Sequence, residues 1–199
     1  MSELLDAALN QLEIGGWVMY PLVLVCLWMW YLIVKKVLDM YVYTKGWRPV
    51  SECIKSAKEG ELVGAPWQQK ILEGFMAERT DDGGMNDEIL ESLKLGQMTF
   101  IKSAVGTIAL LASISPLLGL LGTVGGMIKT FDVIAVFGTG NAKALAGGIS
   151  EALLTTQTGL VVAVPGLFVA TFLARRANGL LDRMQRFCLR ISRSSLSAN

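Results

Sequence analysis

Histidine is absent from the 199 residues of this chain. The absence excludes catalytic triads, metal sites and proton relays that are built on imidazole. Cysteine is scarce, and its three residues lack the spacing of a metal site, so we expect Cys26, Cys53 and Cys188 to be reduced and structural. Paired carboxylates in apolar segments and nucleotide-binding loops are missing as well. We therefore expect no enzymatic activity, no cofactor, no metal and no nucleic-acid partner.

Positive charge is missing from the first 34 residues, although Glu3, Asp6 and Glu13 are acidic. Charge is also nearly absent from three long runs, at residues 17–34, 103–128 and 144–174. The overall composition is 52% hydrophobic, with a mean hydropathy of +0.48. About 20 helical residues cross a hydrocarbon core of about 30 Å, so each run is long enough to span a membrane. The sequence predicts an all-α membrane protein with three transmembrane helices.

The basic residues are distributed unevenly along the chain. They concentrate at residues 35–102 and 175–193, and outside these ranges only Lys129 and Lys143 flank a short loop. By the positive-inside rule, the N-terminus and this loop face the periplasm, and the middle region and the C-terminus face the cytoplasm. We expect no cleaved signal peptide. The predicted parts are an outward segment (1–16), spans at 17–34, 104–137 and 145–174, a cytoplasmic helical domain (35–103), an outer loop (138–144) and a cytoplasmic helical tail (175–199).

The middle region shows helical rather than strand-like periodicity. Pro66 opens one amphipathic segment, residues 80–84 interrupt it, and Asn86 is typical of the next helix start. We expect that helix to run unbroken into the second span. The third span should also continue as a long helix into the cytoplasm, because apolar residues keep their helical spacing between the arginines of the tail. Those arginines fit either a solvated face or a surface for anionic lipid.

Glu151 is the only charged residue within 144–174, and an ionisable group in an apolar span is a functional-site hypothesis. Thr155 and Thr158 follow four and seven residues later on the same helix face, so a polar strip extends inward. A strip of this kind should face other helices or a water path. In the alternative interpretation Glu151 lies at the outer interface, because residues 153–174 alone are long enough to span.

The second span is rich in small residues on one face. Ser115, Gly119, Thr123 and Gly126 recur at helical spacing, and Gly122 and Gly125 widen the stripe. Gly122 and Gly126 are interpreted as close helix packing. Ser115, Gly119, Thr155 and Thr158 are candidate pore-lining residues. Because a carboxyl group that loses its hydration favours its neutral form, and hydroxyls both donate and accept hydrogen bonds, these faces could carry protons.

Two segments are similar to a known family: "SPLLGLLGTVGGMIKTF" and "GGISEALLTTQTGLVVAVPG". In this order and spacing they resemble the two pore-forming helices of the ExbB/TolQ/MotA proton-channel family. The three-span pattern is most similar to the ExbB and TolQ branches, and the short chain and "LLGTVGG" favour ExbB. By resemblance, the proton-pathway residues are Thr123, Glu151 and Thr156. Gly147, Ser150 and Gly125 depart from the family pattern.

The resemblance implies further expectations. The chain should form a homo-oligomer, a pentameric ring in the bacterial inner membrane, around an ExbD-like single-span protein that carries a membrane aspartate. A TonB-like protein would be the driven partner, and the lipid membrane is the surrounding medium. The expected function is that of a proton-driven motor subunit for outer-membrane transport. A TolQ-like role in envelope maintenance and a non-conducting membrane scaffold are the alternatives.

Overall fold

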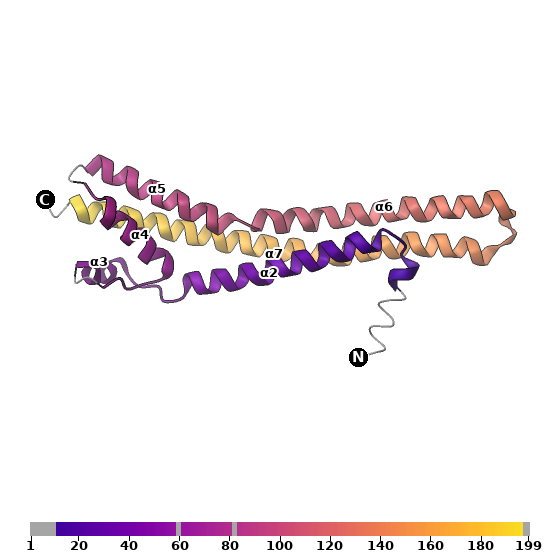
Figure 1. The fold of residues 1–199 in the computed structure, drawn as a ribbon, viewed down its shortest axis with the longest axis horizontal. Coiled ribbons are helices and arrows are strands. Elements are labelled where there is room, and N and C mark those ends of the chain that lie inside the picture. The colour runs from indigo at the N-terminus through magenta and orange to yellow at the C-terminus, as the bar shows by residue number, and fades with distance from the viewer. Residues whose placement is uncertain (1–10, 59–60, 81–82, 197–199) are drawn as a thin grey trace. The chain divides into compact units, whose positions relative to one another are not determined.

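The computed structural model describes residues 11–58, 61–80 and 83–196, so most of the predicted outward segment 1–16 and the last three residues of the tail lie outside the described residues. Within those ranges the regular structure is helical, without strands, in agreement with the predicted fold class. The helices in chain order (Figure 1) are α2 (Met19–Thr44), α3 (Val50–Lys58), α4 (Pro66–Glu78), α5 (Gly83–Lys102), α6 (Val105–Phe137), the short η1 (Gly138–Gly140) and α7 (Ala142–Leu196).

The chain divides into two compact units. The first comprises Met1–Ile33 and Gly106–Thr171, and the second comprises Val34–Val105 and Phe172–Asn199. Helices α2 and α7 each contribute residues to both units. Among the residues that the structure describes, three helices are long and apolar enough to cross a membrane, as the sequence predicted. The protein is therefore a multi-pass helical membrane protein.

In the first unit, α6 and the first part of α7 run antiparallel and in close contact (Figure 1). A Cβ placed on Gly126 would lie 2.6 Å from the carbonyl oxygen of Gly148, and one on Gly159 would lie 2.8 Å from that of Ser115. Such distances leave no room for side chains, so the backbones meet directly. The buried face of α6 consists of Ile108, Ala112, Ser115, Gly119, Gly122, Gly126 and Thr130. We call these residues and their α7 partners the glycine seam.

The beginning of α2 packs on the same two helices. A Cβ on Gly166 would lie 2.5 Å from the sulfur of Met29 and 2.9 Å from the Cβ of Ala112, so all three helices meet there. Leu22 and Met29 are completely buried, whereas Leu24, Leu27, Trp28 and Tyr31 are exposed on the other face of α2. Large apolar side chains on an outer face are typical of a helix in contact with lipid or another membrane helix.

The second unit has a conventional apolar core. Trp67 of α4 is 1% exposed and meets Phe187 of α7 edge-on, with ring centroids 5.2 Å apart. Helix α4 begins at Pro66, as predicted. The buried Gln68 side chain accepts hydrogen bonds from the backbone N–H groups of Arg48 and Ala65, and it donates one to the carbonyl of Arg48. This amide ties the loop before α3 to the start of α4.

Two local predictions need correction. Helix α5 begins at Gly83 rather than near Asn86, and the Asn86 side chain instead bonds both the N–H and the carbonyl of Thr80, at 3.0 and 2.6 Å. The helix also does not run unbroken into the second span: α5 ends at Lys102 and α6 begins at Val105. The break lies at Ala104, which has a left-handed φ of 66° that cannot continue a right-handed helix.

The glycine seam predicts that alanine is tolerated differently at glycines inside the seam and at glycines outside it. Gly126→Ala should destabilise the protein by about 1–3 kcal/mol, the usual cost of overpacking. Gly147→Ala is the matched control, because nothing lies within 4 Å of its added Cβ. That change should be neutral or stabilising by about 0.5–1 kcal/mol, since alanine favours helix. Thermal unfolding in detergent measures both, and equal effects would contradict a close-packed seam.

The predicted orientation in the membrane can be tested by thiol labelling, and the burial of Cys53 affects that test. Its side chain is fully buried, and burial, followed by the nearby Glu52 carboxylate, raises the pKa of the thiol. Because the thiolate is the reactive form, labelling of Cys53 should be slow at neutral pH and should increase only when the pH rises above the ordinary thiol range. Cys53 is therefore a poor reporter of orientation.

Exposed positions give a sharper test in a chain without native cysteines. Gly140→Cys, within the predicted outer loop, should react with an impermeant maleimide in intact cells. Lys55→Cys on α3 is equally exposed and should react only after permeabilisation. Reaction of Lys55→Cys from outside would overturn the orientation.

Candidate functional site

Glu151 of α7 and Lys129 of α6 form an ion pair inside the first unit. The Lys129 ammonium donates to both carboxylate oxygens, at 2.6 and 2.7 Å. The Glu151 side chain is 11% exposed, whereas that of Lys129 is 54% exposed. The carboxylate is thus covered by protein, while its cationic partner has access to the surroundings.

The segment before α2 closes the carboxylate from a third side. Gly16 has a φ of 68°, and a Cβ on it would lie 2.1 Å from a carboxylate oxygen of Glu151 and 3.4 Å from the Lys129 nitrogen. Only glycine combines this backbone conformation with such a close approach. The Gly15-Gly16 pair therefore allows the chain to pass directly over the ion pair.

The glycine seam positions the two charged groups. One turn before Glu151, a Cβ on Gly148 would lie 2.3 Å from the Thr130 hydroxyl oxygen and 2.8 Å from the Gly126 carbonyl oxygen. The helices can approach no closer here. This contact fixes how α6 and α7 are aligned along their axes, so that Lys129 and Glu151 lie at the same level. Trp17 lies beside the same region, with its indole nitrogen 4.0 Å from a Cβ placed on Gly125.

The hydroxyls of the predicted threonines bond backbone carbonyls. Thr155 is fully buried and donates to the carbonyls of Glu151 and Ala152. Thr156 reaches across to α6, where it donates to the Gly119 carbonyl at 3.4 Å. Thr158 and Thr123 bond within their own helices. A hydroxyl relay to Glu151 would therefore require rotation of these side chains or intervening water.

The structure places the other predicted residues on the contact between α6 and α7. Ser115 and Gly119 lie on the buried face of α6, and a Cβ on Gly122 would lie 2.4 Å from the Thr155 side chain. A Cβ on Gly126 would likewise lie 2.6 Å from the Gly148 carbonyl oxygen, so both glycines lie where the two helices are in contact. The pore-lining role of Ser115, Gly119, Thr155 and Thr158 stays a prediction, as does the proton-pathway role of Thr123 and Thr156.

Lys129 is the residue that the sequence interpretation missed, because it was placed only beside the outer loop. The signal was present: the small-residue stripe through Gly122 and Gly126 reaches Lys129 after three more residues. Lys129 is also the only cation of α6. A carboxylate in one span and a cation on the facing stripe of the next form an expected pair.

The site holds a carboxylate under protein cover, next to its counter-ion. A carboxylate with little access to water depends on its counter-ion, and protonation removes the need for that counter-ion. The described residues contain no group of three or more His, Cys, Asp or Glu side chains that could hold a metal ion.

The fold and the site thus define a helical membrane protein with an ion pair between two spans. The sequence profile of the MotA/TolQ/ExbB proton channel family matches residues 64–186. The match covers more than half of the chain, including both α6 and the charged turn of α7. The chain belongs to this family.

Named relatives share the same region. The biopolymer transport protein ExbB of Pseudomonas putida is 34% identical over 128 residues, which cover 62% of this chain and 39% of the relative. The ExbB of Xanthomonas campestris is 29% identical over 114 residues, 57% of this chain and 45% of the relative. A putative ExbB-like protein of Synechocystis is 40% identical over 83 residues, 41% of this chain and 40% of the relative. The chain therefore spans less than half the length of these relatives.

The ion pair can be tested chemically without any functional assay. A membrane-permeant carbodiimide should join Glu151 to Lys129 as an amide, with loss of one water, and mass spectrometry of the digest should find that linked peptide. Lys129→Arg should abolish the link, because a guanidinium keeps the charge but does not form a stable amide. Lys143 is the internal control, since it is exposed and takes part in no ion pair found among the described residues. Coupling of Lys129 only to the nearby Asp132 would contradict the geometry.

Proposed function

We propose that the protein is a ring-forming subunit of a proton-driven motor in the bacterial inner membrane, with an ExbB-like role in outer-membrane transport. The observation that carries this proposal is the enclosed Glu151 carboxylate in a membrane helix, paired with a half-exposed lysine. Family membership and the ExbB-named relatives support the same role. The proposed assembly is a homo-oligomer, a pentamer, around an ExbD-like protein, with a TonB-like protein as the driven partner.

Proton uptake and ion-pair opening are coupled in this proposal. A proton that enters from the periplasm binds the Glu151 carboxylate and removes its attraction for Lys129. The ammonium then turns toward the surroundings, where it already has 54% exposure. When Glu151 releases the proton toward the cytoplasm, the carboxylate recaptures Lys129. The cycle requires no covalent chemistry, no cofactor and no metal.

The driving force is sufficient for mechanical work. One elementary charge that crosses about 100 mV releases roughly 2.3 kcal/mol, so a few protons could rearrange a partner. The released Lys129 is also the group that would meet the membrane aspartate of an ExbD-like helix. Lys129 would then alternate between the carboxylate of its own chain and that of the partner, which couples proton binding to partner movement.

A non-conducting scaffold is the second candidate, and the ion pair itself favours it. Charged pairs between membrane helices can serve only to join them. The two functions differ in what they require of Glu151: the motor needs a group that exchanges a proton, whereas the scaffold needs only a polar contact. Substitutions that separate charge from shape can distinguish them.

We expect Glu151→Gln to assemble with the partner and to lose energy-dependent uptake, because an amide keeps size and polarity but carries no proton. Glu151→Asp should be intermediate, since its reach is one methylene shorter. Asp132→Asn removes an exposed acid at the same end of α6 and serves as the control, with normal uptake expected. The measurement is uptake in cells lacking the native gene, together with co-purification of the partner.

The decisive comparison is between the single variants Lys129→Met and Glu151→Gln and the double variant that carries both changes. Lys129→Met leaves a covered carboxylate without a counter-ion and should lower stability more than Glu151→Gln, which leaves a half-exposed lysine. The double variant should recover stability but not uptake. Normal uptake in the double variant would establish the scaffold and exclude proton transport through Glu151.

The two threonines assigned by resemblance should contribute less. Thr123→Val and Thr156→Val each remove one hydroxyl while approximately keeping shape, so we expect roughly two- to tenfold lower uptake, the scale of one hydrogen bond. Thr171→Val is the control, because its exposed hydroxyl bonds the Leu167 carbonyl of its own helix, away from the ion pair. Equal losses in all three variants would indicate a general folding defect instead of a proton pathway.

A further inference from the structure

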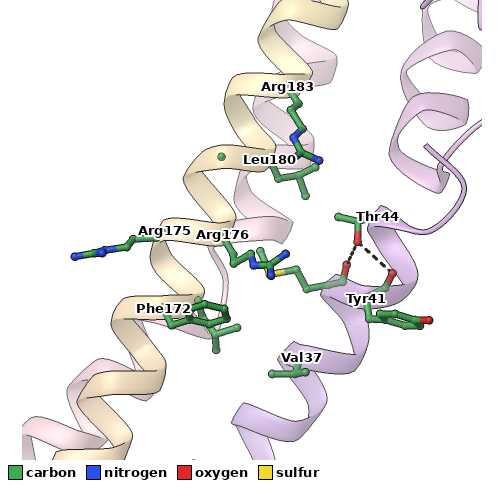
Figure 2. A pocket seen from close by; sticks show the side chains of 11 residues that line it. Val37, Tyr41, Thr44, Phe172, Arg175, Arg176, Leu180 and Arg183 are labelled. Atoms are coloured by element: carbon green, nitrogen blue, oxygen red, sulfur yellow. Dashed lines mark hydrogen bonds between the residues drawn. The ribbon is translucent and has the colours of Figure 1, made fainter. Parts of the chain in front are cut away.

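The second unit contains a pocket that the proton site does not use. It has a volume of about 640 Å³ and lies between the last turns of α2 and residues 172–183 of α7 (Figure 2). Val37 and Tyr41 line it from α2, and Phe172, Leu173 and Leu180 line it from α7. Its walls are therefore largely apolar.

The charge in this pocket has one sign. Arg175, Arg176 and Arg183 line it, and no Asp or Glu does. None of the ion pairs found among the described residues involves these arginines. In Figure 2 the Arg176 guanidinium extends toward α2, whereas that of Arg175 points away from α2. Arg176 also lies 5.4 Å from the centre of the Phe172 ring. Two neighbouring arginines thus differ in how they face the pocket.

The position of the pocket along the chain matches a membrane boundary. Its α2 wall follows the first predicted span, 17–34, and its α7 wall begins where the third, 145–174, ends. In the predicted orientation this is the cytoplasmic boundary. Anionic lipid head groups of that leaflet attract arginines at this depth. Arginine also binds phosphate oxygens in a fork-like geometry.

We propose that this pocket binds an anionic phospholipid of the cytoplasmic leaflet. The lipid phosphate would lie between Arg176 and Arg183, and one acyl chain would lie against Val37, Phe172 and Leu173. A free phosphate would engage the arginines but leave the apolar wall uncovered. A second copy of the chain would need to supply a carboxylate to this pocket. A lipid fits both features, because its phosphate would pair with the arginines and its acyl chain would cover the apolar wall. Its binding is independent of the proposed proton transport.

The test is native mass spectrometry of the delipidated full-length protein in detergent. We expect phosphatidylglycerol to bind and phosphatidylcholine with the same acyl chains to bind weakly. Arg176→Gln and Arg183→Gln should each weaken phosphatidylglycerol binding by about tenfold or more, the scale of a lost charge-assisted hydrogen bond. Arg176→Lys should retain part of the binding. Glycerol phosphate at the same concentration should not displace the lipid.

Two controls keep the test specific. Arg193→Gln removes an exposed arginine of α7 outside the pocket, so it should bind the lipid nearly as well as the parent protein. Thermal unfolding of each variant checks the fold. Equal binding of both lipids, unchanged binding by Arg176→Gln, or displacement by glycerol phosphate would overturn the proposal. Lipid binding to monomers but not to oligomers would assign the pocket to a neighbouring copy instead.

Discussion

The first unit depends on the direct contact between the backbones of α6 and α7. Glycines on both helices remove the side chains that normally separate helix axes, and in a membrane such packing replaces the hydrophobic driving force that lipid cannot supply. Gly126 faces Gly148, and Gly159 faces Ser115, so the contact extends over several turns. The contact sets the relative height of the two helices and therefore decides which polar side chains meet.

The ion pair is a consequence of that height. Lys129 and Glu151 are separated by the turn between the helices, yet the seam holds the ammonium within 2.6 Å of the carboxylate. Gly16 then covers the pair from the segment before α2. The result is an asymmetric pair, with a covered acid and a half-exposed base.

The second unit follows different physical rules. Its core of Trp67, Ile71, Met184 and Phe187 is that of a water-soluble helical domain. Its arginines are arranged around an apolar pocket without acidic partners, which is unusual for a solvated face and typical of a surface that meets anions. In the interpretation advanced above, the same stretch of α7 continues a membrane helix, supports a cytoplasmic core and contacts the lipid boundary.

The sequence by itself determined the three candidate spans and the helical class, and it singled out Glu151 as a candidate, because apolar runs, helical periodicity and an isolated carboxylate are local signals. It also located the α4 start at Pro66, where proline chemistry acts within one turn. It could not place the break at Ala104, which depends on one residue adopting a left-handed conformation. The small-residue stripe pointed toward Lys129, but the sequence could not set the contact of its ammonium with Glu151, orient Arg176 into a pocket, or bring Gly16 over a carboxylate. Only the tertiary structure decided these contacts, because each depends on the height and rotation of one helix against another, and packing sets these.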